Sequence, residues 1–407
     1  MIRTLFERRL ENLIIIPFNI LHYAGQCTFQ IAKTHQQHYI LEEIKAKSNP
    51  RIFAGILHRI ICGTLEALAL FVYCSEVLQT HLSQTSNNPL EYLRIFLRAC
   101  TCIHHFNFVH LVWTGKPKLV KVVNHVATKF DKGQHFTLPV WGIILIPVIF
   151  LGMGIIDVAV VHESPTRNET LFDILMDINS PLFNPEACEL RKTGDAYLTI
   201  GIAYLVNYLA SLTFLCSCVM LSYSADTIIF SIVLLLYLTT RSHLRLLQRS
   251  PIHSEENFSI MMNKYLDVCT LIDLLNETIS CLMLTYVLEA FSFYSVYLKE
   301  IAVFDGECAY TKVKMSIFFI LTCCVFYLCA EIAAMMDKSK FILINSNFTK
   351  SPESQLDLIS IRLQLSSHTY GLSGNGFFLI NYSFVSTVCN TLLTYFIISV
   401  QFQSRGL

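Results

Sequence analysis

Long runs of apolar residues, each about the length of one membrane crossing, dominate the pattern along this chain. A hydrocarbon core of roughly 30 Å needs about 20 mostly apolar residues per helix. The stretches that meet this requirement predict an all-α, polytopic membrane protein with seven transmembrane helices. They are Ala54–Leu78, Glu91–Thr114, Thr137–Val161, a long stretch that begins at Ala196, Cys281–Leu298, Met315–Met336 and Gly376–Phe402.

The stretch that begins at Ala196 stays apolar as far as Thr240, about twice the length that one crossing needs. It could form two spans joined by a turn at Leu221–Asp226, or one helix that crosses once and continues into the cytoplasm. Lys and Arg are concentrated in cytoplasmic loops. With a single crossing and a cytoplasmic N-terminus, the inner segments hold 20 of these residues and the outer segments 7. We therefore predict one crossing here, a cytoplasmic N-terminus and an extracellular C-terminus.

This topology divides the chain into membrane-spanning and cytoplasmic parts. In the cytoplasmic N-terminal segment, residues 1–53, Leu13–Phe18 is expected to form an amphipathic helix on the inner leaflet, since Pro17 argues against a crossing. The segment Gly371–Gly376 is expected to be a flexible break before the last span. The remaining parts are helices 1–4 over 54–240, cytoplasmic helix extensions over 241–280, helices 5 and 6 over 281–336, a cytoplasmic segment over 337–375, and helix 7 with a short extracellular C-terminus over 376–407.

Composition narrows the classes of function. Only 15% of the residues are charged and 53% are hydrophobic, whereas a soluble domain averages about 25% charge. A soluble enzyme and a nucleic-acid binder are therefore excluded. Cysteines two residues apart, such as Cys100 and Cys102, point to different faces of a helix, so we expect no metal site, and no cofactor motif is present.

The predicted outer loops carry two kinds of candidate modification. Of the Asn-x-Ser/Thr sequons, only the one at Asn168 falls in an outer loop, so Asn168 is the candidate glycan site, although an unused sequon is an equal alternative. Cys188 and Cys308 both lie in outer loops, where a disulfide between them would be compatible with the oxidising surroundings.

The last apolar stretch ends with the sequence Thr394-Tyr395-Phe-Ile-Ile-Ser-Val-Gln401-Phe402. It resembles the signature of the insect gustatory receptors, in which Thr-Tyr is followed by five mostly apolar residues and Gln-Phe. The seven-span layout and the basic end of the fourth helix agree with this resemblance. Ser399 departs from the usually apolar positions, and outside the last span the resemblance is one of layout and not of identity.

The resemblance implies a ligand-gated, non-selective cation channel of the plasma membrane, related to the insect odorant receptors. Members assemble as homotetramers or heterotetramers around a central pore lined by the last helix, and cytoplasmic helix extensions form an anchor between subunits. The Gln and Phe of the motif lie near the gate, which assigns Gln401 and Phe402 to it. Phe396 stands where the sugar-receptor branch has Glu, which favours a bitter or other non-sugar tastant over a sugar or nutrient.

The geometry of the last helix is compatible with a pore. At 100° per residue, Thr394, Ile398 and Gln401 share one face, and Tyr395 and Phe402 lie on the next. Four copies would give a ring of amides, which can replace part of the hydration shell of an ion, and rings of Ile, which can close a pore by dewetting. The alternative is that Gln401 bonds to a neighbouring helix. Tyr395 is expected to pack against another helix.

The resemblance also implies a tastant pocket within each subunit, among the second to sixth helices. On the fourth helix, Tyr197, Tyr204 and Tyr208 share one face and suit flat or hydroxylated ligands, with packing as the alternative. Ionisable groups within spans are costly and face protein or water. The further pocket candidates are Asp157, Glu289, Tyr294 and His104 or its neighbour His105, whereas Glu66, Asp226 and Glu331 are expected to bond between helices.

Two other classes of membrane protein fit less well. A seven-helix G-protein-coupled receptor would place the N-terminus outside, against the distribution of Lys and Arg, and the last span lacks the NPxxY pattern usual in that class. A transporter with inverted repeats would show internal similarity, and no such repeat is present. The partners expected of this chain are thus a small-molecule tastant, membrane lipids, the conducted cations and other receptor subunits, with no nucleic acid.

Overall fold

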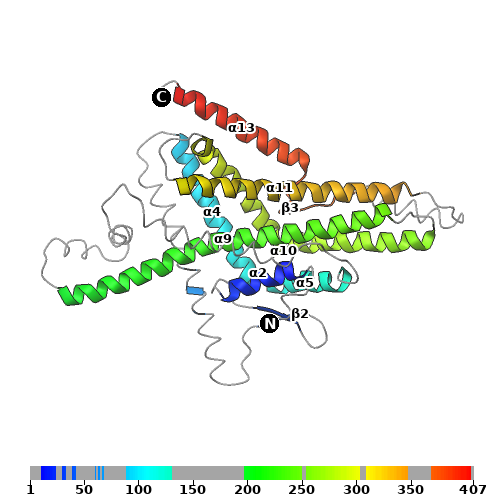
Figure 1. The fold of residues 1–407 in the computed structure, drawn as a ribbon, viewed down its shortest axis with the longest axis horizontal. Coiled ribbons are helices and arrows are strands. Elements are labelled where there is room, and N and C mark those ends of the chain that lie inside the picture. The colour runs from blue at the N-terminus through cyan, green and yellow to red at the C-terminus, as the bar shows by residue number, and fades with distance from the viewer. Residues whose placement is uncertain are drawn as a thin grey trace, which may run out of the picture.

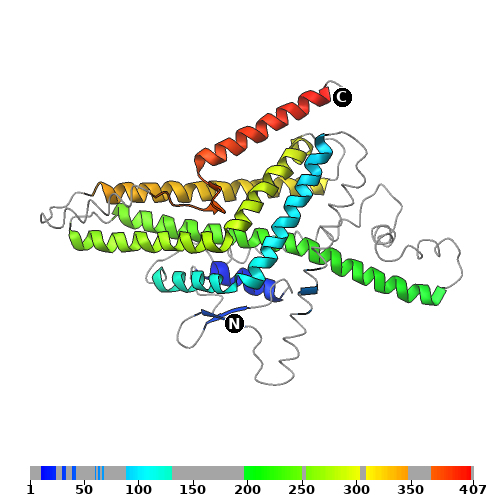
Figure 2. The same cartoon turned by 180° about the vertical axis from the view of Figure 1, so that it is seen from behind.

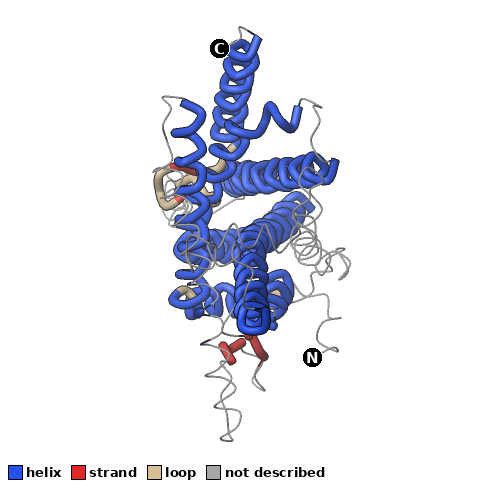
Figure 3. The backbone as a smooth tube through the Cα atoms, turned by 90° about the vertical axis from the view of Figure 1, so that its left-hand side faces the viewer, coloured by secondary structure: helices blue, strands red, loops and turns tan. Residues whose placement is uncertain are grey.

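The structure is a computed structural model that describes residues 11–23, 30–33, 39–42, 60, 63–64, 67, 89–130, 197–249, 254–302, 309–346 and 368–404. These residues form long helices and two short antiparallel hairpins (Figures 1 and 3), so the expected all-α class is confirmed. The helices are α2 (Asn12–Tyr23), α4 (Pro89–Thr114), α5 (Lys116–Lys129), α9 (Tyr197–Arg249), α10 (Glu255–Ala302), α11 (Ala309–Ile344) and α13 (Tyr382–Ser404), and the strands are β1 (Gln30–Lys33), β2 (Tyr39–Glu42), β3 (Ser373–Gly374) and β4 (Phe378–Leu379).

Three helices are much longer than a membrane crossing requires. Helix α9 has 53 residues, which is about 80 Å at 1.5 Å per residue, against roughly 30 Å of hydrocarbon. No turn interrupts it at Leu221–Asp226, which confirms the prediction of one continuous helix. Among the described residues, four helices are long and apolar enough to cross a membrane, in α4, α9, α10 and α11, and α13 is a shorter apolar helix.

The long helices lie alongside one another. Helices α9 and α11 pack together, α4 packs along the C-terminal part of α10, and α13 contacts both α10 and α11 (Figures 1 and 2). Helix α10 changes direction partway along (Figure 2), although it contains no Pro or Gly. The hydroxyls of Thr278 and Thr285 donate to carbonyls of the preceding turn, an arrangement that bends helices.

The apolar core follows these contacts. Side chains of α9, α10 and α11 that point toward each other are fully buried, and they join one continuous cluster with α2 and α5; examples are Ile232, Leu236, Leu271, Leu275, Ile332, Phe18 and Val122. This core also includes the parts of the helices that are expected to lie in the cytoplasm, because apolar side chains are buried there too.

The N-terminal apolar segment forms the helix α2. The side chains of Leu13–Phe18 are buried, because α2 packs against α9, and the position of this helix at the inner leaflet stays a prediction. The β1–β2 hairpin continues from this helix. Asn19 of α2 accepts from the amide of Ile31 at 2.9 Å and donates to its carbonyl at 3.2 Å.

The segment before the last helix is an ordered hairpin and not the flexible break that the sequence suggested. Strands β3 and β4 pair, and the turn between them has positive φ at Asn375 (50°) and Gly376 (78°), the combination typical of type I′ turns. The last helix therefore begins at Tyr382 instead of Gly376. Asn381 defines this start, since its Oδ1 accepts from the amide of Phe384 at 2.9 Å.

Several sequence predictions concern residues outside those described. The span Thr137–Val161 and most of Ala54–Leu78 are among them, so the number of seven spans stays a prediction. Asn168, Cys188, Cys308, Asp157 and Glu66 also lie outside the described residues.

Candidate functional site

Helix α13 carries the motif that suggested a pore, and it rests on the protein by one side only. Phe384, Val385, Val388 and Leu392 pack against the core. Beyond these contacts α13 runs out to the edge of the molecule, where the chain ends (Figure 1). Most of its remaining surface is exposed in the single chain.

The exposed side of α13 is marked by a row of polar side chains. At 100° per residue, their positions fall within about 60° of arc, so they form one stripe along the whole helix. The hydroxyls of Thr387 and Thr394 donate to carbonyls one turn earlier, at 2.9 and 2.8 Å. The members of this polar row are Ser383, Thr387, Asn390, Thr394 and Gln401, all exposed.

The sequence motif identified only the end of this row. Ile398 and Thr394 are exposed next to Gln401, as a pore face requires, whereas the side chain of Phe402 lies outside the described residues. Asn390 was missed, although its spacing of four residues from Thr394 was a usable signal. Tyr395 packs edge to face on Phe291 of α10, with ring centroids 6.1 Å apart, which confirms the expected packing.

A second group of polar side chains is buried between α4 and α10. Thr285 donates its hydroxyl hydrogen to the carbonyl of Cys281 or Leu282, so it accepts from Nδ1–H of His104, at 3.1 Å. This fixes the tautomer of His104 and leaves Nε2 facing Glu289, whose Oε2 is 3.9 Å away. Oε1 of Glu289 accepts from Thr101 at 2.9 Å.

The buried group continues toward α9 and α11. Tyr294 and Tyr286 of α10 reach the same hydroxyl, that of Thr322 on α11, at 3.1 and 3.5 Å. The ring of Tyr286 lies 6.1 Å from that of His104. On α9, Asp226 is close enough to interact electrostatically with Glu289. We call these residues the buried polar cluster: Thr101, His104, Asp226, Thr285, Tyr286, Glu289, Tyr294 and Thr322.

This cluster brings together three of the predicted pocket residues, His104, Glu289 and Tyr294. Their threonine partners were missed, because threonines are frequent in apolar helices and nothing local distinguishes these. The tyrosines at 197, 204 and 208 do lie on one continuous helix, α9, but their side chains are outside the described residues. Glu331 bonds between helices as expected, since it accepts from the hydroxyl of Tyr382.

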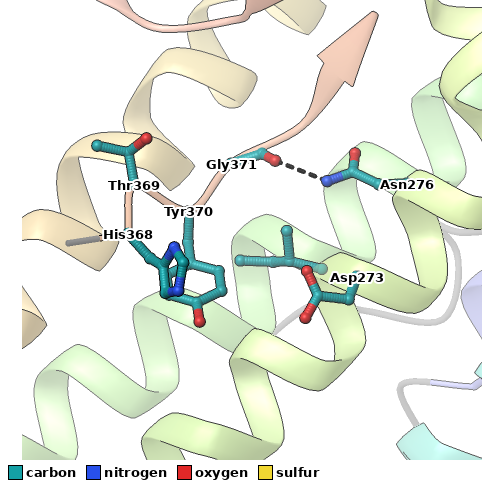
Figure 4. Close-up of a pocket in the computed structure, with 7 residues that line it drawn as sticks. Asp273, Asn276, His368, Thr369, Tyr370 and Gly371 are labelled. Atoms are coloured by element: carbon teal, nitrogen blue, oxygen red, sulfur yellow. Dashed lines mark hydrogen bonds between the residues drawn. The ribbon is translucent and has the colours of Figure 1, made fainter. Parts of the chain in front are cut away.

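A pocket of about 280 Å³ lies where α10 meets the residues that precede β3 (Figure 4). Asp273 and Asn276 of α10 face it from one side, and His368 and Tyr370 from the other (Figure 4). Partial burial, with Cys269 and Asp273 nearby, raises the pKa of the Tyr370 phenol, so it stays a neutral donor. No sequence signal identified this pocket, because its walls come together only through the packing of α10 on the chain near residue 370.

No family model and no curated protein sequence matches the chain. Solved structures do match it. The insect olfactory receptor OR5 from Machilis hrabei in complex with eugenol aligns over 96% of this chain and 98% of its own, with a TM-score of 0.55 and 12% sequence identity. A second structure of the same receptor aligns over 95% and 97% of the two chains, with a TM-score of 0.52 and 14% identity.

These alignments cover almost the whole of both chains, so the likeness extends beyond a shared helix pair. Together with the long apolar helices, they describe a multi-pass membrane protein. The chain therefore has the fold of the insect olfactory receptors.

Proposed function

We propose that this protein is a chemoreceptor of the plasma membrane, a cation channel opened by a small organic ligand. The observation that carries the proposal is the polar row of α13, an exposed stripe of hydroxyls and amides along a helix that is apolar overall. Facing lipid, such a stripe would be costly. Facing an aqueous path between subunits, it would be hydrated.

Four subunits around one axis, the assembly implied by the gustatory receptor resemblance, would place the polar rows together. Amides of Asn390 and Gln401 would then form two neutral rings, which favour partly dehydrated cations without fixing one ion. Ile398 lies one turn before Gln401 and would form an apolar ring that can close by dewetting.

The buried polar cluster is the proposed ligand-binding region. Its groups lie within the membrane-spanning helices, where uncompensated polarity is expensive and usually functional. Its tyrosine rings suit flat organic compounds. The structural neighbour binds eugenol, a small aromatic compound, and Phe396 departs from the Glu of sugar receptors. We therefore favour a bitter or other non-sugar tastant over a sugar or nutrient.

The test is current recording from cells that express the chain, alone and with related receptor subunits. The ligand panel contains eugenol, caffeine, denatonium, sucrose and fructose. We expect cation currents that persist in excised patches without GTP, which distinguishes a channel from a G-protein-coupled receptor.

Asn390→Ala and Gln401→Ala should alter ion selectivity or block, whereas the control Ser386→Ala, outside the polar row, should not. Selectivity unchanged in both amide variants would contradict the pore assignment.

A further inference from the structure

Asn276 connects α10 to the chain that leads into α13. Its Nδ2 donates to the carbonyl of Gly371 at 3.0 Å (Figure 4). Its Oδ1 accepts from the amide of Ser373, also at 3.0 Å. One side-chain amide thus pairs with the extended segment Gly371–Ser373 as a neighbouring strand would. We call this pair of hydrogen bonds the asparagine clamp, and Gly371–Ser373 the clamped segment. Asp could not make both bonds, because a carboxylate has no hydrogen to donate.

The clamped segment is also packed tightly on its other side. A Cβ added at Gly371 would lie 3.3 Å from Cβ of Ala333 on α11 and 3.0 Å from Cδ1 of Leu379. The segment is therefore held between α10 and α11, and it has little room to move independently of them.

From the clamp to α13, each step of the chain is hydrogen-bonded. Ile380 donates to the carbonyl of Leu372 at 3.0 Å, which closes the β3–β4 hairpin. At its tip, Phe377 donates to the carbonyl of Gly374 at 2.9 Å. Asn381 follows directly and caps α13. A displacement at Asn276 would consequently reach the first turn of α13 through a stiff connection.

The other end of the same helix belongs to the buried polar cluster. Thr285 and Glu289 lie on α10, which is continuous from Asn276 to both. At 1.5 Å per residue, Glu289 is about 20 Å farther along. We infer that Asn276 is the positioning residue that transmits movement of α10 to the pore helix. This inference rests on the proposed function of α10 and α13.

The test compares substitutions at Asn276 by current recording with the same panel of compounds. In Asn276→Ala, the ratio of saturating evoked current to basal current should fall by at least about fivefold, the usual scale of coupling between sites. Asn276→Asp keeps the acceptor for Ser373 and loses the donor to Gly371, so its loss should be smaller. Asn263→Ala, on the exposed side of α10, is the matched control and should behave as the native chain.

Hydrogen exchange on the purified receptor provides the second measurement. In Asn276→Ala, the amide of Ser373 should exchange faster, whereas amides in α9 should not change. Surface labelling shows whether each variant reaches the membrane, and Asn276→Leu, which also lacks both the donor and the acceptor, replaces the alanine variant if that one does not.

The outcomes separate the two proposals. Faster exchange of the Ser373 amide with an unchanged current ratio would mean that the clamp is purely structural. This result, or an unchanged exchange rate, would overturn the inference about Asn276 and leave the proposed function in place. Absence of currents from the native chain, with or without partner subunits, would contradict the proposed function and the inference together.

Discussion

Three asparagine side chains bond to the backbone of an extended segment in the same way, each with one donor and one acceptor. Asn19 pairs with Ile31, Asn124 of α5 pairs with Tyr39, and Asn276 pairs with Gly371 and Ser373. An isolated two-stranded hairpin is marginally stable in water. These clamps attach each hairpin to a helix, so the strands do not depend on their own few ladder bonds.

The pair of Glu289 and His104 leads to a prediction about ligand sensitivity. Glu289→Gln keeps the shape and the oxygen that accepts from Thr101, but replaces the carboxyl group that faces Nε2 of His104, 3.9 Å away, with an amide that carries hydrogens. A side-chain hydrogen bond contributes about 0.5–1.5 kcal/mol, so this change of donors and acceptors should shift the half-maximal ligand concentration by up to about tenfold. Dose–response recording measures this shift, and unitary conductance should stay constant.

The matched control for Glu289→Gln is Glu256→Gln, at the exposed beginning of α10. It makes the same chemical change far from the buried polar cluster and should leave the dose–response curve in place. A curve that does not move in Glu289→Gln, or a conductance that changes instead, would remove the cluster from the ligand-binding region.

Sequence patterns identified the ionisable side chains of the buried polar cluster, which are costly to bury, but not their hydrogen-bond partners. A charge in a long apolar run is conspicuous, so Glu289 and His104 could be found. Thr101 and Thr285 could not, because the helix pairing that brings α4 beside α10 joins residues more than 170 positions apart. The asparagine clamps were missed for the same reason, since Asn276 and Gly371 are separated by 95 positions.

At the scale of elements, the sequence predicted helices well and their ends less well. Helix α9 was predicted as one unit because charge distribution rejected a turn in its middle. The start of α13 was placed several residues early, because Gly376 and Phe377 continue the apolar run although they belong to a hairpin. The decisive signal was local: Asn375-Gly376 favours a type I′ turn, and Asn381 is a good N-cap.

The cap of α13 gives the second prediction. Asn381→Ala removes the acceptor of the Phe384 amide, a change that costs about 1 kcal/mol at a helix N-terminus. The amides of Ser383 and Phe384 should then exchange faster with deuterium. Asn381→Asp retains an acceptor at the same place and should restore the slow exchange. If Asn381→Ala leaves these amides protected, the start of α13 is fixed by the hairpin alone.

At the scale of the whole molecule, the fold is shared with the olfactory receptor at only 12 to 14% identity. Such low identity is consistent with a membrane fold that constrains the residue type at few positions. Spanning helices need length and apolarity, their order and orientation follow from loop charges, and few positions require one residue type. If the last span lines a pore, as we propose, its positions would impose residue types, which would explain why its motif stands out.

The orientation of the molecule in the membrane is the last prediction, and the distribution of Lys and Arg supports it. With the N-terminus inside, the inner segments hold 20 Lys and Arg against 7 outside. An epitope tag after Leu407 should therefore be stained on intact cells, and a tag before Met1 only after permeabilisation. Asn168→Gln adds an internal check, because a glycan at that site would be lost. Staining in the opposite order would exclude the channel topology and return the G-protein-coupled alternative to first place.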